Sequence, residues 1–323
     1  MSGGKIRVGL WALFGFQLLM AWPCGVVHGA DPFPTKPIRL ISPQGPGSAN
    51  DLVCRMLADP LSKQLGVPVV VENKVGGGGA TAGDYVAKSR PDGYTLYSAA
   101  AASIIIIPVL TTTYKPEDLV LVSKIGGSPM LLTVKADSPF KTFDEMLDFA
   151  KKNPGKLTYG TAGHGSLTYF AMEILKLKTG ANMTFVPTSA GTTNLAALLG
   201  GHVDMIFDSL GTQRGLIASG NIRPLTVVPK THFLPDVPST AEKGLPEVPA
   251  SWLAYFAPKG IPEPIVQKLA QGFETVCKSP TVISQADKMG FGLDYVRPEI
   301  FSKEIPSQYK AIEDIAKKVG LAK

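Results

Sequence analysis

Three short loops in this 323-residue chain carry residues whose types and spacing suit the capture of a small anion. They run over Pro43–Asp51, Gly163–Ser166 and Pro187–Thr193, and each precedes a segment with helical spacing. Glycine lets backbone N–H groups approach a ligand, and a helix N-terminus adds unpaired N–H groups with a partial positive charge. Each loop therefore predicts a carboxylate or phosphate cradle. The alternative is an ordinary capped turn, with Asn50 or Asp51 capping the first helix.

Some of the same residues could form a catalytic set. His164 stands between two glycines next to Ser166, and Asp208 follows a predicted strand. An enzyme would need these side chains to converge on one reacting atom, whereas a histidine at a loop tip is more simply an exposed residue. The chain lacks the Gly-x-Ser-x-Gly hydrolase motif, the Walker phosphate-binding loop and the His-Glu-x-x-His zinc-protease motif. Gly77–Ala82 fits a dinucleotide-binding pattern, but it follows the second strand instead of opening the fold. We expect no catalytic residue, no metal and no cofactor.

Composition excludes other classes of protein. The chain is 45% hydrophobic and 18% charged, which is typical of a globular protein. Its net charge of +6 is spread along the sequence without a long basic run, so we expect no nucleic-acid partner. The three cysteines cannot form a disulfide framework. Cys54 and Cys277 could pair after export, or remain as two buried thiols.

The N-terminus has the pattern of an export signal. Lys5 and Arg7 precede an apolar run over residues 8–20, and the small residues Gly29 and Ala30 follow. A charged start, a short apolar segment and a small-residue end predict a signal peptide over residues 1–30 that is removed on export. Cys24 leaves a lipid anchor as one alternative, and an uncleaved segment is another.

Strand-like and helix-like segments alternate, and this pattern occurs twice. The first set comprises strands at 37–41, 67–72 and 94–98 with helices at 51–65 and 80–88. The second comprises strands at 157–160, 183–186 and 205–207 with helices at 167–178 and 193–199. The apolar stretch over 98–110 is predicted as a buried strand and loop. The alternation predicts two similar α/β lobes with mostly parallel sheets.

The order of the segments also predicts how the chain divides. Strand-like segments at 119–134 and 252–258 would be the two crossings between lobes, and helices at 263–278, 281–289 and 301–319 would complete the first lobe. We therefore expect lobe 1 at 31–130 and 252–323, and lobe 2 at 131–251. Ligands of such sheets bind beyond the carboxyl ends of the strands, which predicts a cleft between the lobes.

A series of short segments, in this order, resembles one family. They include Phe33–Leu40, Val69–Lys74, Pro91–Leu96, Asn153–Leu157, Leu198–Asp204, Asp236–Glu242 and Phe256–Gly260. The chain resembles the extracytoplasmic solute receptors of tripartite tricarboxylate transporters, called Bug receptors. The resemblance implies a type II Venus-flytrap fold in the periplasm, closing on a small carboxylate held largely by backbone amides and water.

The resemblance also assigns ligand-binding residues, which carry over onto the three loops and one strand end. These are Gln44, Gly47, Ser48, Ala49, Asn50, Asp51, Gly163, His164, Gly165, Ser166, Tyr169, Thr188, Ser189, Ala190, Gly191 and Asp208. Gln44 and Thr188 stand where the family has large aromatic residues, so we expect a ligand that is bulkier or richer in oxygen, such as an aromatic carboxylate. Tyr169 could stack on its ring or pack within the lobe.

The resemblance implies partners as well. We expect a monomer that binds a small carboxylate and delivers it to the membrane permease subunits of a tripartite tricarboxylate transporter. A sensor kinase is an alternative partner, and a periplasmic enzyme acting on a carboxylate is the alternative function.

Overall fold

Two mixed β-sheets organise the part of the chain that the computed structural model describes, residues 1, 3, 33–111, 113–188, 192–246 and 248–322. The chain divides into Met1–Phe33 and a compact unit over Pro34–Lys323. The predicted signal peptide lies almost wholly outside the described residues and stays a prediction. All that follows concerns the compact unit.

Sheet A has the strand order β11-β4-β10-β3-β1-β2. Its strands are β1 (Ile38–Ser42), β2 (Val69–Asn73), β3 (Thr95–Ala100), β4 (Leu119–Gly127), β10 (Leu253–Pro258) and β11 (Gly292–Val296). β1 pairs in parallel with β2 and β3, whereas β10 runs antiparallel to both β3 and β4. The carboxyl ends of β1 to β4 therefore share one edge, and β10 begins at that edge.

Sheet B has the order β7-β6-β8-β5-β9. Its strands are β5 (Met130–Lys135), β6 (Thr158–Gly160), β7 (Thr184–Phe185), β8 (Met205–Ser209) and β9 (Ile222–Val228). β6 is parallel to β7 and β8, and β5 is antiparallel to β8 and β9. β5 therefore begins, and β9 ends, at the edge where β6, β7 and β8 have their carboxyl ends.

The two sheets repeat one arrangement. In each, three parallel strands stand in the order second, first, third, and an antiparallel strand that has just arrived from the other sheet follows them. This confirms the predicted two-lobed α/β fold with two crossings. Both crossings, β4 to β5 and β9 to β10, join the carboxyl edge of one sheet to that of the other. The topology thus places the loops of both carboxyl edges on either side of the crossings. The lobe boundaries given above stay a prediction.

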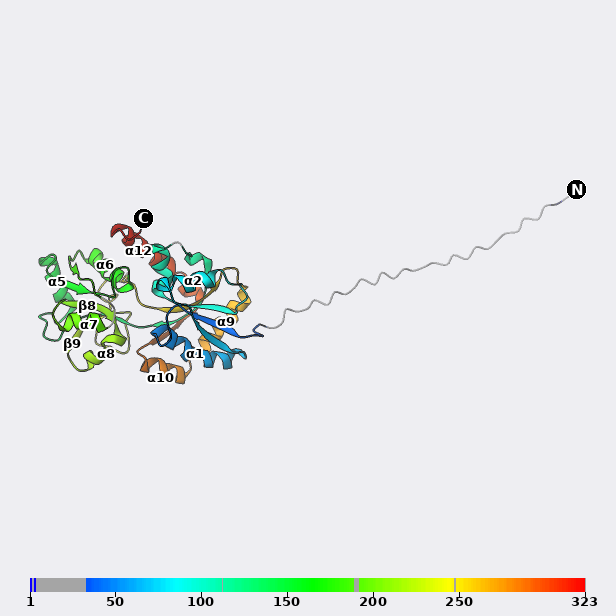
Figure 1. Ribbon diagram of the computed structural model, residues 1–323, viewed down its shortest axis with the longest axis horizontal. Coiled ribbons are helices and arrows are strands. Elements are labelled where there is room, and N and C mark those ends of the chain that lie inside the picture. Colours follow the sequence, from blue (N-terminus) through cyan, green and yellow to red (C-terminus); the bar gives the residue numbers. More distant parts are fainter. Residues whose placement is uncertain (2, 4–32, 112, 189–191, 247, 323) are drawn as a thin grey trace. The chain divides into compact units, whose positions relative to one another are not determined.

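Helices cover both sheets, and Figure 1 shows that early and late parts of the chain share one body. Around sheet A lie α1 (Ala49–Leu65), η1 (Gly77–Gly79), α2 (Ala80–Ala87), α3 (Ala101–Ile105), α4 (Ile107–Leu110), η2 (Pro116–Asp118), α9 (Glu263–Cys277), α10 (Pro280–Lys288), α11 (Pro298–Phe301) and α12 (Ile305–Lys318). Around sheet B lie α5 (Phe143–Lys152), α6 (Leu167–Thr179), α7 (Thr192–Leu199) and α8 (Leu210–Ala218). α12 contacts α3, α4 and α6, so it packs on elements of both lobes.

Two sequence expectations need correction. Residues 101–105 and 107–110 form the short helices α3 and α4 and not a loop: Ala101 and Ala102 favour helix, and Pro108 is accepted near the start of α4. The helix expected over 301–319 is two helices, since α11 ends at Phe301 and α12 begins at Ile305. Among the described residues, no helix has the length and apolar character needed to cross a membrane.

Cys54 and Cys277 are free thiols in the interior, so the alternative of two buried thiols is the one the structure has. Burial raises the pKa of Cys54 to about 11 and that of Cys277 to about 12. Both are therefore protonated and unreactive at neutral pH.

Candidate functional site

The first loop makes a tight turn that starts α1. In Gly45-Pro46-Gly47-Ser48 the backbone N–H of Ser48 donates to the carbonyl of Gly45 at 3.2 Å. Gly47 has φ +79°, a value that glycine adopts without the strain of a side chain. The hydroxyl of Ser48 accepts from the Asp51 N–H at 3.3 Å and caps α1. The cap is therefore Ser48, and the alternative that assigned it to Asn50 or Asp51 is wrong.

The second loop repeats this turn in the other lobe. In Gly163-His164-Gly165-Ser166 the Ser166 N–H donates to the Gly163 carbonyl, also at 3.2 Å. Gly165 has φ +76°, and the Ser166 hydroxyl accepts from the Tyr169 N–H at 3.1 Å, which caps α6. A shared Gly-x-Gly-Ser sequence thus starts the helix that follows the first parallel strand of each sheet, α1 after β1 and α6 after β6. This short motif is legible in the sequence itself.

Asp51 holds the first loop closed. Its buried carboxylate accepts from the Gly47 N–H at 2.9 Å, from Arg55 Nε at 2.9 Å and from Asn73 Nδ2 at 2.8 Å. The hydrogen bond from Arg55, helped by those from Asn73 and Gly47, lowers the pKa of Asp51 to about 2. Asn73 also donates to the carbonyl of Gln44. The Gly47 N–H is consequently used within the loop.

Two neighbours complete this loop. The Asn50 side chain is buried and donates to the carbonyl of Ser98 on β3, which ties the start of α1 to sheet A. Gln44, Gly47 and Ala49 are exposed. Asn73 was not among the predicted residues. It is within reach because the parallel pairing of β1 and β2 sets it opposite Ser42, at the same carboxyl edge.

Aromatic rings surround the second loop. The exposed His164 ring lies 4.7 Å from the ring centroid of Tyr169 and 4.7 Å from that of Phe185. Tyr169 is only 5% exposed and also packs against Phe170 and Phe185. Burial raises the pKa of Tyr169. This geometry favours the packing role for Tyr169, and it is His164 that presents a ring to solvent.

A buried polar network joins the remaining predicted residues of lobe 2. Thr188 Oγ1 lies 2.8 Å from the carbonyl oxygen of Thr161 and 2.9 Å from Asn194 Oδ1. Asn194 Nδ2 donates to Asp208 Oδ2 at 2.9 Å, and the Ser209 N–H donates to the other Asp208 oxygen at 2.7 Å. Thr188 and Asp208 are thus brought together through Asn194, which the sequence reasoning missed.

The predicted residues therefore form two groups. One follows β1 in sheet A, and the other follows β6, β7 and β8 in sheet B, each at a carboxyl edge. Ser189, Ala190 and Gly191 lie outside the described residues. The convergence of the two groups on one ligand stays a prediction. Within the described part of the chain, no group of three or more His, Cys, Asp and Glu residues could hold a metal ion.

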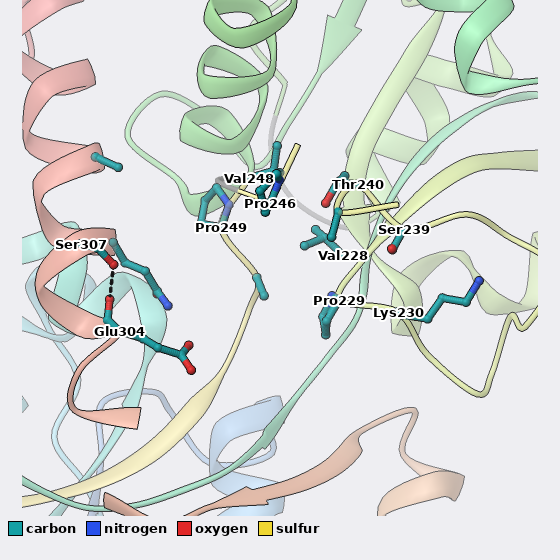
Figure 2. Close-up of a pocket in the computed structure, with 14 residues that line it drawn as sticks. Val228, Pro229, Lys230, Ser239, Thr240, Pro246, Val248, Pro249, Glu304 and Ser307 are labelled. Carbon is teal, nitrogen blue, oxygen red and sulfur yellow. Dashed lines mark hydrogen bonds between the residues drawn. The ribbon is translucent and has the colours of Figure 1, made fainter. Parts of the chain in front are cut away.

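One cavity of the described residues lies away from these loops. Figure 2 shows it between α12 and the segment that follows β9, with a volume of about 490 Å³. Its walls are mostly Val, Pro and Ala, with Lys230, Ser307 and Gln308 among the polar residues. None of the predicted ligand-binding residues lines it. It borders the second crossing, since its lining includes Val228 at the end of β9 and Ala250 before β10.

The family of the chain follows from a match over most of its length. Residues 53–321 match the family described as Tripartite tricarboxylate transporter family receptor. This chain belongs to that receptor family. The resemblance read from the sequence is thereby confirmed, and the family is one of solute-binding receptors.

Relatives of the receptor cover most of its chain. A protein of Cupriavidus necator described as "UPF0065 protein in gbd 5'region" is 35% identical over 298 residues, which is 91% of this chain and 90% of the relative. Protein BugT of Bordetella pertussis is 35% identical over 262 residues, covering 79% and 80%. These relatives support the Bug type of receptor.

Two similar solved structures are described as complexes with a small carboxylate. "R. palustris Rpa4515 with adipate" is 29% identical with a TM-score of 0.69, covering 90% of this chain and 99% of that one. MatC from Rhodopseudomonas palustris "with bound malate" is 26% identical with a TM-score of 0.65, covering 88% and 99%.

Proposed function

We propose that this receptor captures a small organic carboxylate in the periplasm, between the carboxyl edges of its two lobes. The observation that carries the proposal is membership of the receptor family over residues 53–321, together with related structures described with adipate and with malate. Ligand that contacts both lobes better when they are closed would shift the receptor toward a closed population. We further propose that it delivers the ligand to the membrane subunits of a tripartite tricarboxylate transporter.

The geometry supports this location in two ways. Both crossings join carboxyl edges, so the Gly-x-Gly-Ser loops stand at the edges that the hinge brings together. Each loop leads into a helix of at least three turns, α1 or α6, whose first N–H groups are suited to an anion. A water-mediated hydrogen bond to a carboxylate can be nearly as favourable as a direct one.

The rival enzyme hypothesis is less well supported. It needs His164, Ser166 and Asp208 around one reacting atom. Instead, Ser166 Oγ caps α6 and lies 3.0 Å from Thr168 Oγ1, Asp208 is held by Asn194, and His164 packs on Tyr169 and Phe185.

Thermal melting of the mature protein against mono-, di- and tricarboxylates, including adipate, malate and benzoate, tests the proposal. A ligand at 100 times its dissociation constant adds about 2.7 kcal/mol, which shifts a melt by several degrees. A carboxylate that shifts the melt and is recovered unchanged supports the receptor. Consumption of the compound would favour the enzyme, and the absence of any shift would contradict carboxylate binding.

The expected width of the pocket has its own test. Thr188 stands where the family has a tyrosine, so the substitution Thr188→Tyr should fill that space and weaken binding of the best ligand at least ten-fold. Unchanged affinity, measured by titration calorimetry, would contradict a ligand that uses the wider pocket. Transport requires a separate experiment, in which loss of the receptor abolishes uptake of that ligand by cells.

A further inference from the structure

The buried side chain of Asn194 links three loops of lobe 2 through hydrogen bonds. Its side chain is fully buried, and both atoms of its amide are in use. Oδ1 faces the hydroxyl of Thr188, which also reaches the carbonyl of Thr161 after β6, and Nδ2 donates to Asp208 at the end of β8. One amide thus connects the ends of β6, β7 and β8, where ligands of such sheets bind.

The space around Asn194 is built for this amide. A Cβ atom on Gly160, the last residue of β6, would collide with Asn194 Oδ1 and lie 3.0 Å from Thr188 Oγ1. The backbone of Asp208 is held as well, since its carbonyl oxygen accepts from the side-chain amide Nε2 of the buried Gln213 at 2.9 Å. The lack of a side chain at Gly160 therefore leaves the space in which Asn194 and Thr188 make their hydrogen bonds.

A neutral amide can make both bonds at once. Thr188 has a single hydroxyl proton for two acceptors, and Asp208 Oδ2 accepts from Asn194 Nδ2. An apolar residue of the same size would take the Nδ2 donor away from the buried Asp208 Oδ2 and the Oδ1 contact away from Thr188, and losing a hydrogen bond to a buried carboxylate is costly. Asp208 is the titratable group that Asn194 contacts.

We propose that Asn194 is a positioning residue that sets ligand affinity by holding Thr188 and Asp208 in place at the carboxyl edge of sheet B. The inference rests on the proposed function and deepens it. Asn194 lies in the interior and acts through its two partners, so its effect on binding should exceed the effect of an equally buried apolar neighbour.

The variants Asn194→Leu and Asn194→Asp test it, with adipate and malate as the probes. Asn194→Leu should bind at least ten-fold more weakly than wild type at every pH. In Asn194→Asp two carboxylates would face each other at hydrogen-bond distance, so the pair should share a proton. At pH 5.5 the protonated carboxyl group introduced at position 194 can donate like the amide, and affinity should lie within three-fold of wild type. At pH 8 it should fall at least ten-fold.

Leu198→Ala is the matched control, because Leu198 lies on the same helix, is fully buried and belongs to an apolar cluster with Leu195 and Ile206. It should lower the melting temperature while leaving the affinity relative to wild type independent of pH. Wild-type affinity in Asn194→Leu, or a wild-type pH profile in Asn194→Asp, would overturn the inference.

The failure of the proposed function is distinguishable from the failure of this inference. If the wild type binds neither probe, carboxylate binding at this site is contradicted by the wild type alone. The role of Asn194 in holding Thr188 and Asp208 is then tested by the melting temperatures of wild type and Asn194→Asp at several pH values. Asn194→Asp should lose stability relative to wild type between pH 5.5 and pH 8, and a parallel pH profile of the two proteins would overturn it.

Discussion

The two Gly-x-Gly-Ser loops share a backbone and differ in what holds them. Both have the Ser-to-Gly hydrogen bond at 3.2 Å and a glycine with φ near +80° before the capping serine. Three residues after the cap, the first loop has Asp51, whose carboxylate returns to the Gly47 N–H. The second has Tyr169 at that position, and its ring packs on His164 instead.

The difference teaches how one turn is adapted in each lobe. In the first loop the Gly47 amide and the Arg55 guanidinium are both committed to Asp51, so the loop carries and neutralises its own anion. In the second loop aromatic contacts take over the support, and the lobe's buried carboxylate, Asp208, is held by the Asn194 amide and a backbone N–H. Asp51 forms an ion pair with Arg55, whereas Asp208 accepts hydrogen bonds from the Asn194 amide and a backbone N–H. The stability of the two lobes should therefore respond differently to substitutions around these carboxylates.

The largest effect is expected for Asp51→Asn. Because the pKa of Asp51 falls to about 2 in the folded chain, its carboxylate stabilises the fold by about 2.5 kcal/mol at pH 7. A lowered pKa gives stability that is present above the unfolded value near 4 and is lost as the pH falls toward 2. Urea unfolding at pH 7 should show the full loss for the variant, and at pH 2 the two proteins should converge.

Asp59→Asn, on the exposed face of the same helix, is the control and should change the unfolding free energy little. A gap between Asp51→Asn and wild type that is the same at pH 2 and pH 7 would contradict the ion-pair account of this loop.

Gly160→Ala should come next, with a loss of about 2 kcal/mol, because the added methyl group must displace Asn194 or Thr188. Gly215→Ala is the matched control in the same lobe, since its Cβ would meet no atom within 4 Å. It lies within α8, where alanine should be neutral or stabilising. Chemical unfolding that ranked the two variants equally would refute the close packing at Gly160.

Removal of either cap should cost about 1 kcal/mol, and the two lobes should respond alike. Ser48→Ala and Ser166→Ala each leave an N–H at the third helical position without its acceptor. Threonine at either position should restore most of the loss, because it keeps the hydroxyl. A much larger effect at one of the two serines, in unfolding titrations, would show that the turns are not equivalent.

The smallest effect is expected for His164→Ala. The ring is exposed, so its contacts with Tyr169 and Phe185 should contribute only about 0.5 kcal/mol to stability. A loss above about 2 kcal/mol in unfolding experiments would mean that His164 is part of the core of lobe 2. His164→Phe keeps an aromatic ring and should remain close to wild type.

Local patterns predicted much of this fold. The strands and helices expected in the two α/β repeats lie within a few residues of their expected positions, because alternating apolar segments and glycine-rich turns act over short distances, whereas α5, α8, β9 and β11 were not expected. Misplaced elements such as α3 and α4 fall where an apolar stretch has no clear period. There, burial alone does not distinguish a short helix from a loop.

The sequence by itself determined the family, the doubled α/β pattern and the loops that start α1 and α6. Tertiary structure decided which residues hold the two buried carboxylates. Asn73 reaches Asp51 from 22 residues away because β1 and β2 pair in register, and Asn194 reaches Asp208 from 14 residues away because α7 packs beside β8. Hydrogen bonds of this kind depend on strand register and helix packing, which no local spacing of residues encodes.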